Sequence, residues 1–203
     1  MLNANLRASH SASFCAIGAS AGGVTAIRRL LQSIDSRNDL PIGIVQHMPS
    51  NSRIDVSLIY GGAPNRRVIE VEDKMKIESS YTYMSAPGYH LLIEKDRSFG
   101  LTQDDLENYS RPSIDVFFKT VATVFGASAI GILLTGANSD GAAGLKAISD
   151  RGGLTIVQEP GEAECDTMPR SALDLFRPTH VLPLNEIAAF LNLVSFSSEE
   201  LRI

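Results

Sequence analysis

Short apolar runs alternate along the chain with segments whose apolar residues recur every three or four positions. The run Phe14–Ala19 predicts a buried strand that ends in a glycine-rich turn. A helix is predicted next, with one apolar face made of Val24, Ile27, Leu30, Leu31 and Ile34. The run 41–46 predicts a second buried strand. The chain therefore opens with a β-α-β unit, which is typical of a parallel sheet covered by helices.

The middle of the chain is less regular. Its patterns predict short strands at 68–71, 81–86, 90–94 and 98–103, with hairpin-type turns at Pro87-Gly88 and Asp96-Arg97. We therefore expect an antiparallel extension in this region.

From Ser113 onward the alternation returns. Helices are predicted from 113 to about 124, through Leu145 and Ile148, at 169–176 and at 185–194, and strands at 129–134, 154–157 and 181–184. We predict one α/β domain over residues 14–194, preceded by a polar leader (1–13) and followed by a polar tail (195–203).

Composition narrows the class of protein. Of the 203 residues, 44% are apolar and 20% are charged, as in ordinary globular domains. A net charge of -5 argues against a partner held by nucleic-acid phosphates. The longest nearly apolar run, 127–137, is too short to cross a bilayer, and the leader lacks a signal-peptide core, so we expect a cytoplasmic protein. Two cysteines are too few for a disulfide framework, and we expect Cys15 to have a core role.

Candidate chemistry gathers where the predicted strands end, because ligands of open α/β sheets bind beyond the carboxyl ends of the strands. Ser20 follows the first strand, His47 the second, and Asp140 lies in the segment after the strand at 129–134. A hydroxyl, an imidazole and a carboxylate are the groups that a serine hydrolase uses. The acidic run 159–166 has no metal-ligand spacing, so we expect no metal and no cofactor.

The serine is the most specific of the three residues. Gly18-x-Ser20-x-Gly22 matches the G-x-S-x-G nucleophile elbow in a strand-turn-helix context. The backbone N–H of Ala21 and the following helix would then face the oxyanion. The alternative is a phosphate-binding turn, although the motif is neither G-x-G-x-x-G nor a P-loop.

The other two residues have structural alternatives. A lone histidine such as His47 is more often structural or solvent-facing than catalytic. Asp140 precedes the helix predicted to begin at Ala142, so it could act as that helix's N-cap. Asp115 and the Arg111-Pro112-Ser113 segment are expected to cap the helix that starts at 113, with Arg111 also available to contact an acidic substrate.

Five motifs follow one another along the chain: Ile17–Gly23 (IGASAGG), Gln46–Pro49 (QHMP), Arg111–Asp115 (RPSID), Leu134–Gly144 and Met168–Ala172 (MPRSA). Taken together, they resemble the catalytic domain of the CheB chemotaxis methylesterase family. The similarity runs from about Phe14 to Leu193. It implies a doubly wound, mostly parallel sheet flanked by helices on both faces, with an antiparallel hairpin extension.

The resemblance also implies an activity. Members hydrolyse γ-glutamyl methyl esters on methyl-accepting chemoreceptors, and some deamidate receptor glutamines. The family triad corresponds to Ser20, His47 and Asp140, and its oxyanion hole to the backbone N–H groups of Ala21 and Ala137. The chain order Ser, His, Asp differs from that of α/β-hydrolases, which implies a convergent triad.

Two departures from the family pattern bear on this expectation. Ala21 replaces the usual threonine, and Ala137-Asn138 replaces a Met-Gly pair. Only 13 residues precede Phe14, too few for the receiver domain common in the family, so we expect constitutive activity or control by a separate regulatory protein. Two alternatives stay open: a non-catalytic signalling or scaffold module outside chemotaxis, and a nucleotide-binding protein.

Overall fold

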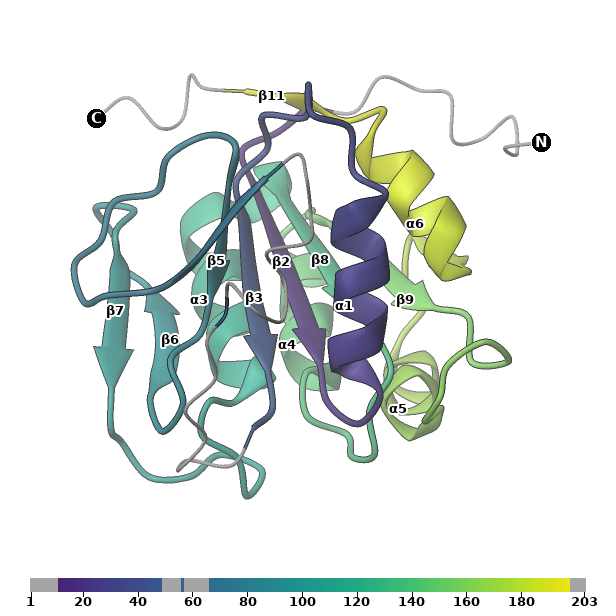
Figure 1. Ribbon diagram of the computed structural model, residues 1–203. Coiled ribbons are helices and arrows are strands. Elements are labelled where there is room, and N and C mark those ends of the chain that lie inside the picture. The colour runs from purple at the N-terminus through teal and green to yellow at the C-terminus, as the bar shows by residue number, and fades with distance from the viewer. Residues whose placement is uncertain (1–10, 49–55, 57–65, 198–203) are drawn as a thin grey trace.

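Among residues 11–48, 56 and 66–197, which this computed structural model describes, seven parallel strands form the central sheet (Figure 1). Its order is β10-β9-β8-β2-β3-β5-β4. The strands are β2 (Phe14–Ala19), β3 (Ile42–Gln46), β4 (Arg67–Glu70), β5 (Tyr81–Met84), β8 (Ala129–Leu133), β9 (Leu154–Gln158) and β10 (His180–Leu182). The order reverses direction between β2 and β8, so the predicted doubly wound sheet is confirmed.

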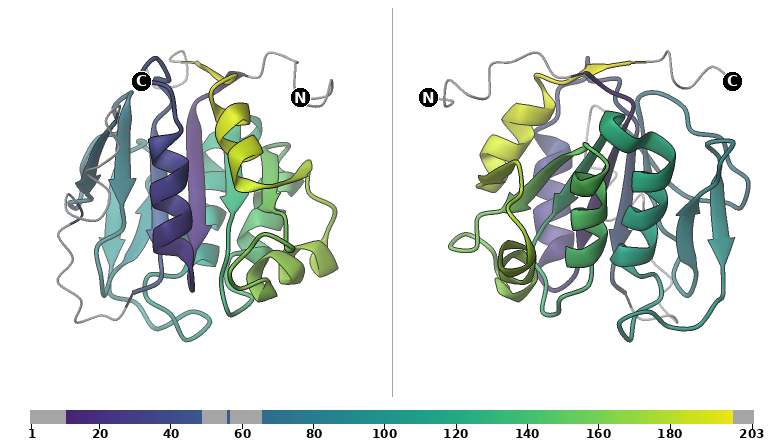
Figure 2. Two further views of the ribbon diagram at one scale, coloured as in Figure 1. Left: turned by 45° about the vertical axis from the view of Figure 1, so that its right-hand side comes forward. Right: turned by 180° about the vertical axis from the view of Figure 1, so that it is seen from behind.

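Helices cover both faces of this sheet (Figure 2). On one face lie α1 (Gly23–Gln32) and α6 (Leu184–Leu191), and on the other lie α3 (Ile114–Phe125), α4 (Ala142–Asp150) and α5 (Thr167–Leu175). A short 3-10 turn, η2 (Gly126–Ser128), ends α3. Successive side chains of a strand point to opposite faces, and β2 accordingly places Ile17 in one core and Ala16 in the other.

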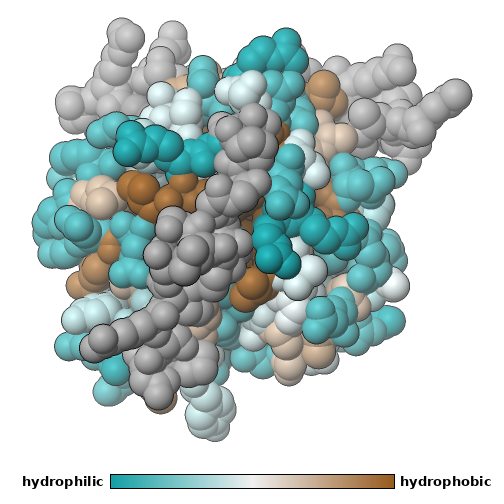
Figure 3. All heavy atoms as spheres, in the orientation of Figure 1, coloured by the Kyte–Doolittle hydropathy of each residue, from teal (hydrophilic) through white to brown (hydrophobic). Residues whose placement is uncertain are grey.

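The periodicity of α1 follows its burial. Ile27, Leu30 and Leu31 are completely buried against the sheet, whereas Arg28 and Arg29 are exposed. The outer surface over α1 is accordingly hydrophilic in the space-filling view (Figure 3). The apolar stripe therefore fixes which face of the helix meets β2 and where the preceding turn must lie.

The middle of the chain departs from the prediction. β6 (His90–Ile93) and β7 (Phe99–Thr102) form an antiparallel pair, so the predicted turn at Asp96-Arg97 is confirmed. The predicted hairpin at Pro87-Gly88 is wrong, because β5 pairs in parallel with β3 and β4 in the main sheet, whereas β6 pairs with β7. The physical reason is two-sided burial: Tyr83 lies in one core and Met84 in the other, as in an interior strand.

One pairing has no counterpart in the sequence analysis. β1 (Ser11–Ala12) pairs in parallel with β11 (Ser195–Phe196) and joins the two ends of the described chain. Strands of two residues carry no periodic signal.

Within the described residues no helix has the length and apolar character needed to cross a membrane.

Candidate active site

The carboxyl ends of β2, β3 and β8 lie side by side, and backbone hydrogen bonds hold the segments that follow them. The N–H of His47 donates to the carbonyl of Ala19 (3.0 Å), and the N–H of Ser20 donates to the carbonyl of Thr135 (2.9 Å). Ala19 pairs with Gln46 in the sheet register, so Ser20 and His47 occupy equivalent positions, each directly after the end of one of two neighbouring strands. The structure thus brings two of the predicted residues to one edge of the sheet.

Asp140 reaches the same edge and contacts the histidine directly. Its Oδ2 lies 2.8 Å from Nε2 of His47. The Asp140 side chain is fully buried, and that of His47 is 12% exposed. Burial acts to raise the pKa of Asp140, but the hydrogen bonds from His47, Asn108 and two backbone N–H groups outweigh it and hold that pKa below its usual value.

The structural alternative for Asp140, the N-cap of α4, is wrong. The N-cap position of α4 is Gly141, with φ of 92°, and no side chain caps that helix. The carboxylate instead accepts hydrogen bonds from the N–H groups of Ile114 (2.7 Å) and Asp115 (3.1 Å), in the first turn of α3. The positive end of α3 therefore stabilises the Asp140 charge. The expected cap of α3 is confirmed at Ser113, whose Oγ accepts from the Val116 N–H and donates to Asp140 Oδ1 (2.9 Å).

Ser20 lies in the predicted elbow. The turn closes with the Gly23 N–H on the Ser20 carbonyl (2.8 Å), and α1 begins at Gly23. Gly22 has φ of 78°, a left-handed conformation that glycine adopts without a Cβ penalty. The half-buried Ser20 hydroxyl makes no hydrogen bond to another described residue, His47 included.

Gln46 is a positioning residue that the sequence analysis missed. Its side-chain Nε2 donates to the carbonyls of both Ser20 and His47, each at 2.9 Å. The Gln46 side chain is buried, with 2% exposure for the residue. A glutamine inside an otherwise apolar strand was the available signal, because a buried amide needs partners.

Ala21 and Ala137 lie on the two loops that flank Ser20. Their N–H groups donate to no other described residue, and both residues are exposed. Thr135 joins these loops, because its Oγ1 donates to the Ala21 carbonyl at 2.8 Å. Asn138 does not have a positive φ, and its Oδ1 accepts from the Asp140 N–H (3.2 Å). The substitution of Asn138 for glycine is therefore accommodated by an Asx turn.

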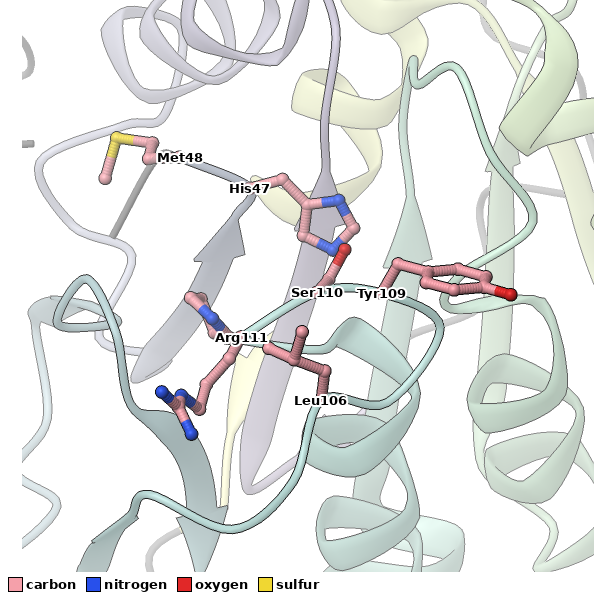
Figure 4. Close-up of a pocket in the computed structure, with 7 residues that line it drawn as sticks. His47, Met48, Leu106, Tyr109, Ser110 and Arg111 are labelled. Carbon is pink, nitrogen blue, oxygen red and sulfur yellow. The ribbon is translucent and has the colours of Figure 1, made fainter. Parts of the chain in front are cut away.

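A cavity of about 440 Å³ opens beside the imidazole (Figure 4). It is lined by His47, Met48, Leu106, Tyr109, Ser110, Arg111 and Pro112. Leu106 is 59% exposed and Tyr109 is 97% exposed, so both present apolar surface at this cavity. The Arg111 Nη1 donates hydrogen bonds to the carbonyls of Gln103 and Asp104.

Other candidate residues lie away from this arrangement. Cys15 is completely buried, and burial raises the pKa of its thiol to about 12, as expected for a core cysteine. His90 is buried at the start of β6, where its Nδ1 accepts from the Ser113 N–H (3.2 Å). In the described part of the chain, no group of three or more His, Cys, Asp or Glu side chains could hold a metal ion.

Comparison with known proteins identifies a matching family and several similar proteins. The chain matches the family described as CheB methylesterase over residues 15–191. A Leptospira interrogans protein named as a protein-glutamate methylesterase/protein-glutamine glutaminase is 45% identical over 172 residues, which cover 85% of this chain and 89% of the relative. Proteins of that name from Saccharophagus degradans and Archaeoglobus fulgidus are 35% and 30% identical, and the chain spans about half of their length.

The fold also matches a solved structure. The crystal structure of the Thermotoga maritima CheB methylesterase catalytic domain superposes with a TM-score of 0.85 at 24% identity. The match covers 90% of this chain and 99% of that one, so the two share their architecture.

Proposed function

The chain belongs to the CheB methylesterase family, and from this premise we propose that it is a serine hydrolase that demethylates γ-glutamyl methyl esters on chemoreceptors. The names of its relatives support a second reaction, the deamidation of receptor glutamines. The observation that carries the proposal is the contact between His47 and the buried Asp140 beside the Ser20 elbow.

In the proposed reaction Ser20 Oγ attacks the ester carbonyl while His47 takes its proton. The tetrahedral intermediate collapses when His47 returns that proton to the methoxide, which leaves as methanol. Water, deprotonated by His47, then cleaves the glutamyl-Ser20 ester and releases the free carboxyl group. Asp140 holds the imidazole in one orientation and stabilises its charged form.

The proposed oxyanion hole uses the N–H groups of Ala21 and Ala137. Support comes from their lack of an acceptor among the described residues and from the position of Ala21 before the first turn of α1. Removing one such donor costs roughly 3 kcal/mol of transition-state stabilisation. The backbone atoms survive the departures from the family pattern at both positions.

The proposed partners are the cytoplasmic segments of methylated chemoreceptors, which would place the protein in the cytoplasm. Exposed Leu106 and Tyr109 at the His47 cavity suit a protein segment better than a small polar ester. The chemistry itself needs no cofactor, because nucleophile, base and carboxylate all come from the chain.

Methanol release from a methyl-esterified receptor fragment tests the proposal. We expect the wild-type chain to release methanol and Ser20→Ala to lose at least about 10⁴-fold in kcat. Ser33→Ala, which removes an exposed hydroxyl at the end of α1, serves as the matched control and should keep the wild-type rate. Equal rates in wild type and Ser20→Ala would overturn the proposed role of Ser20. A wild-type chain that hydrolyses neither this fragment nor an activated ester would favour the non-catalytic signalling module.

A further inference from the structure

Asn108 lies on the segment between β7 and α3, and its side-chain amide joins two carboxylates. Nδ2 is 2.9 Å from Asp140 Oδ1 and 3.0 Å from Asp115 Oδ2. An amide nitrogen carries two hydrogens, so it can donate one to each carboxylate. Sequence patterns gave no sign of this role, because Asn108 stands in a polar segment (103–110) that carries no periodicity.

The two carboxylates are buried like charges. Burial is the main cause of the raised pKa of Asp115, and the neighbouring Asp140 charge raises this pKa further. The hydrogen bond from the Gly144 N–H acts in the opposite direction and lowers it. The titratable groups that face Asp140 are His47 from the end of β3 and Asp115 from α3. Lys119 acts on Asp115 in turn, and Arg111 lines the cavity beside His47. A donor placed between the carboxylates lowers their repulsion.

The backbone suits this residue type. Asn108 has φ of 51°, a left-handed conformation in which asparagine and aspartate are enriched. Its neighbours Leu106 and Tyr109 line the cavity beside His47. One loop therefore supplies both a surface of that cavity and a hydrogen bond to Asp140.

We propose that Asn108 is a positioning residue for ester hydrolysis, whose amide holds the Asp140 carboxylate ionised and aimed at His47 Nε2 despite the neighbouring Asp115. The inference rests on the proposed function, since it assigns Asn108 a role toward the same Ser20–His47–Asp140 set. Asn108 acts through Asp140, and no described contact joins it to Ser20 or His47.

Two variants separate the amide from the backbone conformation. Asn108→Gly removes the donor but tolerates φ of 51°, and Asn108→Asp keeps the shape but replaces the donor by a carboxylate. We expect kcat to fall about tenfold in Asn108→Gly and about a hundredfold in Asn108→Asp, with KM changed less than twofold.

The pH profile gives a readout that a purely structural role would not move. Without the amide donor, the charge of the ionised Asp140 carboxylate is less neutralised. This charge then favours the imidazolium form of His47, and the carboxylate itself also binds a proton more easily. Both protonations remove the active pair, so the acid limb of kcat/KM should move to higher pH, by about one unit in Asn108→Asp. The control is Asn38→Ala: Asn38 bonds Leu191 and Leu40 far from the site, so its loss should lower the Tm and leave the limb in place.

An NMR titration of the His47 ring gives a readout apart from activity. A rise in the His47 pKa in both Asn108 variants supports the inference, and wild-type titration and wild-type kcat in Asn108→Asp overturn it. If the wild-type chain shows no Ser20-dependent ester hydrolysis, the proposed function fails, and an unchanged His47 titration in the same variants then overturns the positioning role separately.

Discussion

The imidazole of His47 meets the carboxylate of Asp140 through Nε2, at 2.8 Å. A carboxylate only accepts hydrogen bonds, so Nε2 carries the proton and, in the neutral ring, Nδ1 holds the free lone pair. In chymotrypsin-like enzymes the two nitrogens have the reverse roles. Under the proposed function, Nδ1 is therefore the atom that takes the proton from Ser20.

The first prediction concerns this tautomer. In ¹⁵N spectra of the wild-type chain with the His47 ring neutral, we expect Nε2 to be protonated and Nδ1 not. In the wild type the two carboxylate oxygens of Asp140 share several donors. In Asp140→Asn a single amide oxygen must accept these hydrogen bonds, so the His47 ring loses its fixed tautomer. We expect kcat on an activated ester to fall about 10³- to 10⁴-fold.

Asp96→Asn is the matched control for this change. Asp96 is exposed in the turn between β6 and β7, where its carboxylate accepts from the Ser98 hydroxyl and pairs with Lys76 from the segment before β5. Its variant should keep wild-type kcat. A wild-type spectrum with the proton on Nδ1 would contradict the assignment of the base.

The second prediction concerns Asp115, the other buried carboxylate. Both of its oxygens accept hydrogen bonds, from Gly144 N–H (2.6 Å) and Asn108 (3.0 Å), as an ionised carboxylate does. Asp115→Asn removes a negative charge that acts on Asp140, so the Asp140 carboxylate should protonate at lower pH. The acid limb of kcat/KM should move down by about half a unit, opposite to the Asn108 variants.

Asp150→Asn provides the comparison, because Asp150 pairs with Lys146 on the exposed surface of α4. Its profile should coincide with that of the wild type. An upward shift of the limb in Asp115→Asn would mean that Asp115 does not act on the pair as a charge.

The third prediction separates substrate docking from chemistry. Leu106 and Tyr109 line the cavity beside His47 and are largely exposed, so truncating them removes contact area without disturbing a core. In a Leu106→Ala/Tyr109→Ala double variant, KM for a methylated receptor fragment should rise about tenfold, with kcat on a small activated ester unchanged.

Leu175→Ala is the control, since Leu175 is also exposed (48%) but lies at the end of α5, outside that cavity. It should leave both substrates unaffected. Equal changes toward the receptor fragment and the small ester would show that the loop acts on the chemistry instead.

The sequence predicted β2, β3, β8, β9 and β10 of the main sheet because these strands are short apolar runs with glycine or proline nearby. β2 begins and ends at the predicted residues, Phe14 and Ala19. The placement of β5 failed because a four-residue run does not reveal how many of its sides are covered. Burial of Tyr83 and Met84 on opposite faces is a property of the tertiary structure.

The site was predicted in part. Ser20, His47 and Asp140 were grouped as one candidate site because each follows a predicted strand, and the structure brings His47 and Asp140 into contact. The helix that Asp140 serves was missed, since it begins 26 residues earlier, at Ile114. Asn108 was missed for a similar reason: its partners are set by the path of a loop, which carries no periodicity.

The fourth prediction concerns the elbow itself. Gly22 has φ of 78°, and a Cβ added there would lie 2.7 Å from Cβ of Glu164. Gly22→Ala should therefore lower the free energy of unfolding by about 1–2 kcal/mol, which corresponds to a Tm about 5 °C lower. Because the strain lies between Ala21 and the first turn of α1, kcat on an activated ester should also fall. Gly161→Ala is the control: the nearest atom to its added Cβ is Glu159 Oε1 at 3.9 Å, so Tm and kcat should stay at wild-type values. A Gly22→Ala variant as stable and active as Gly161→Ala would show that the turn relaxes without cost to the alignment of Ser20.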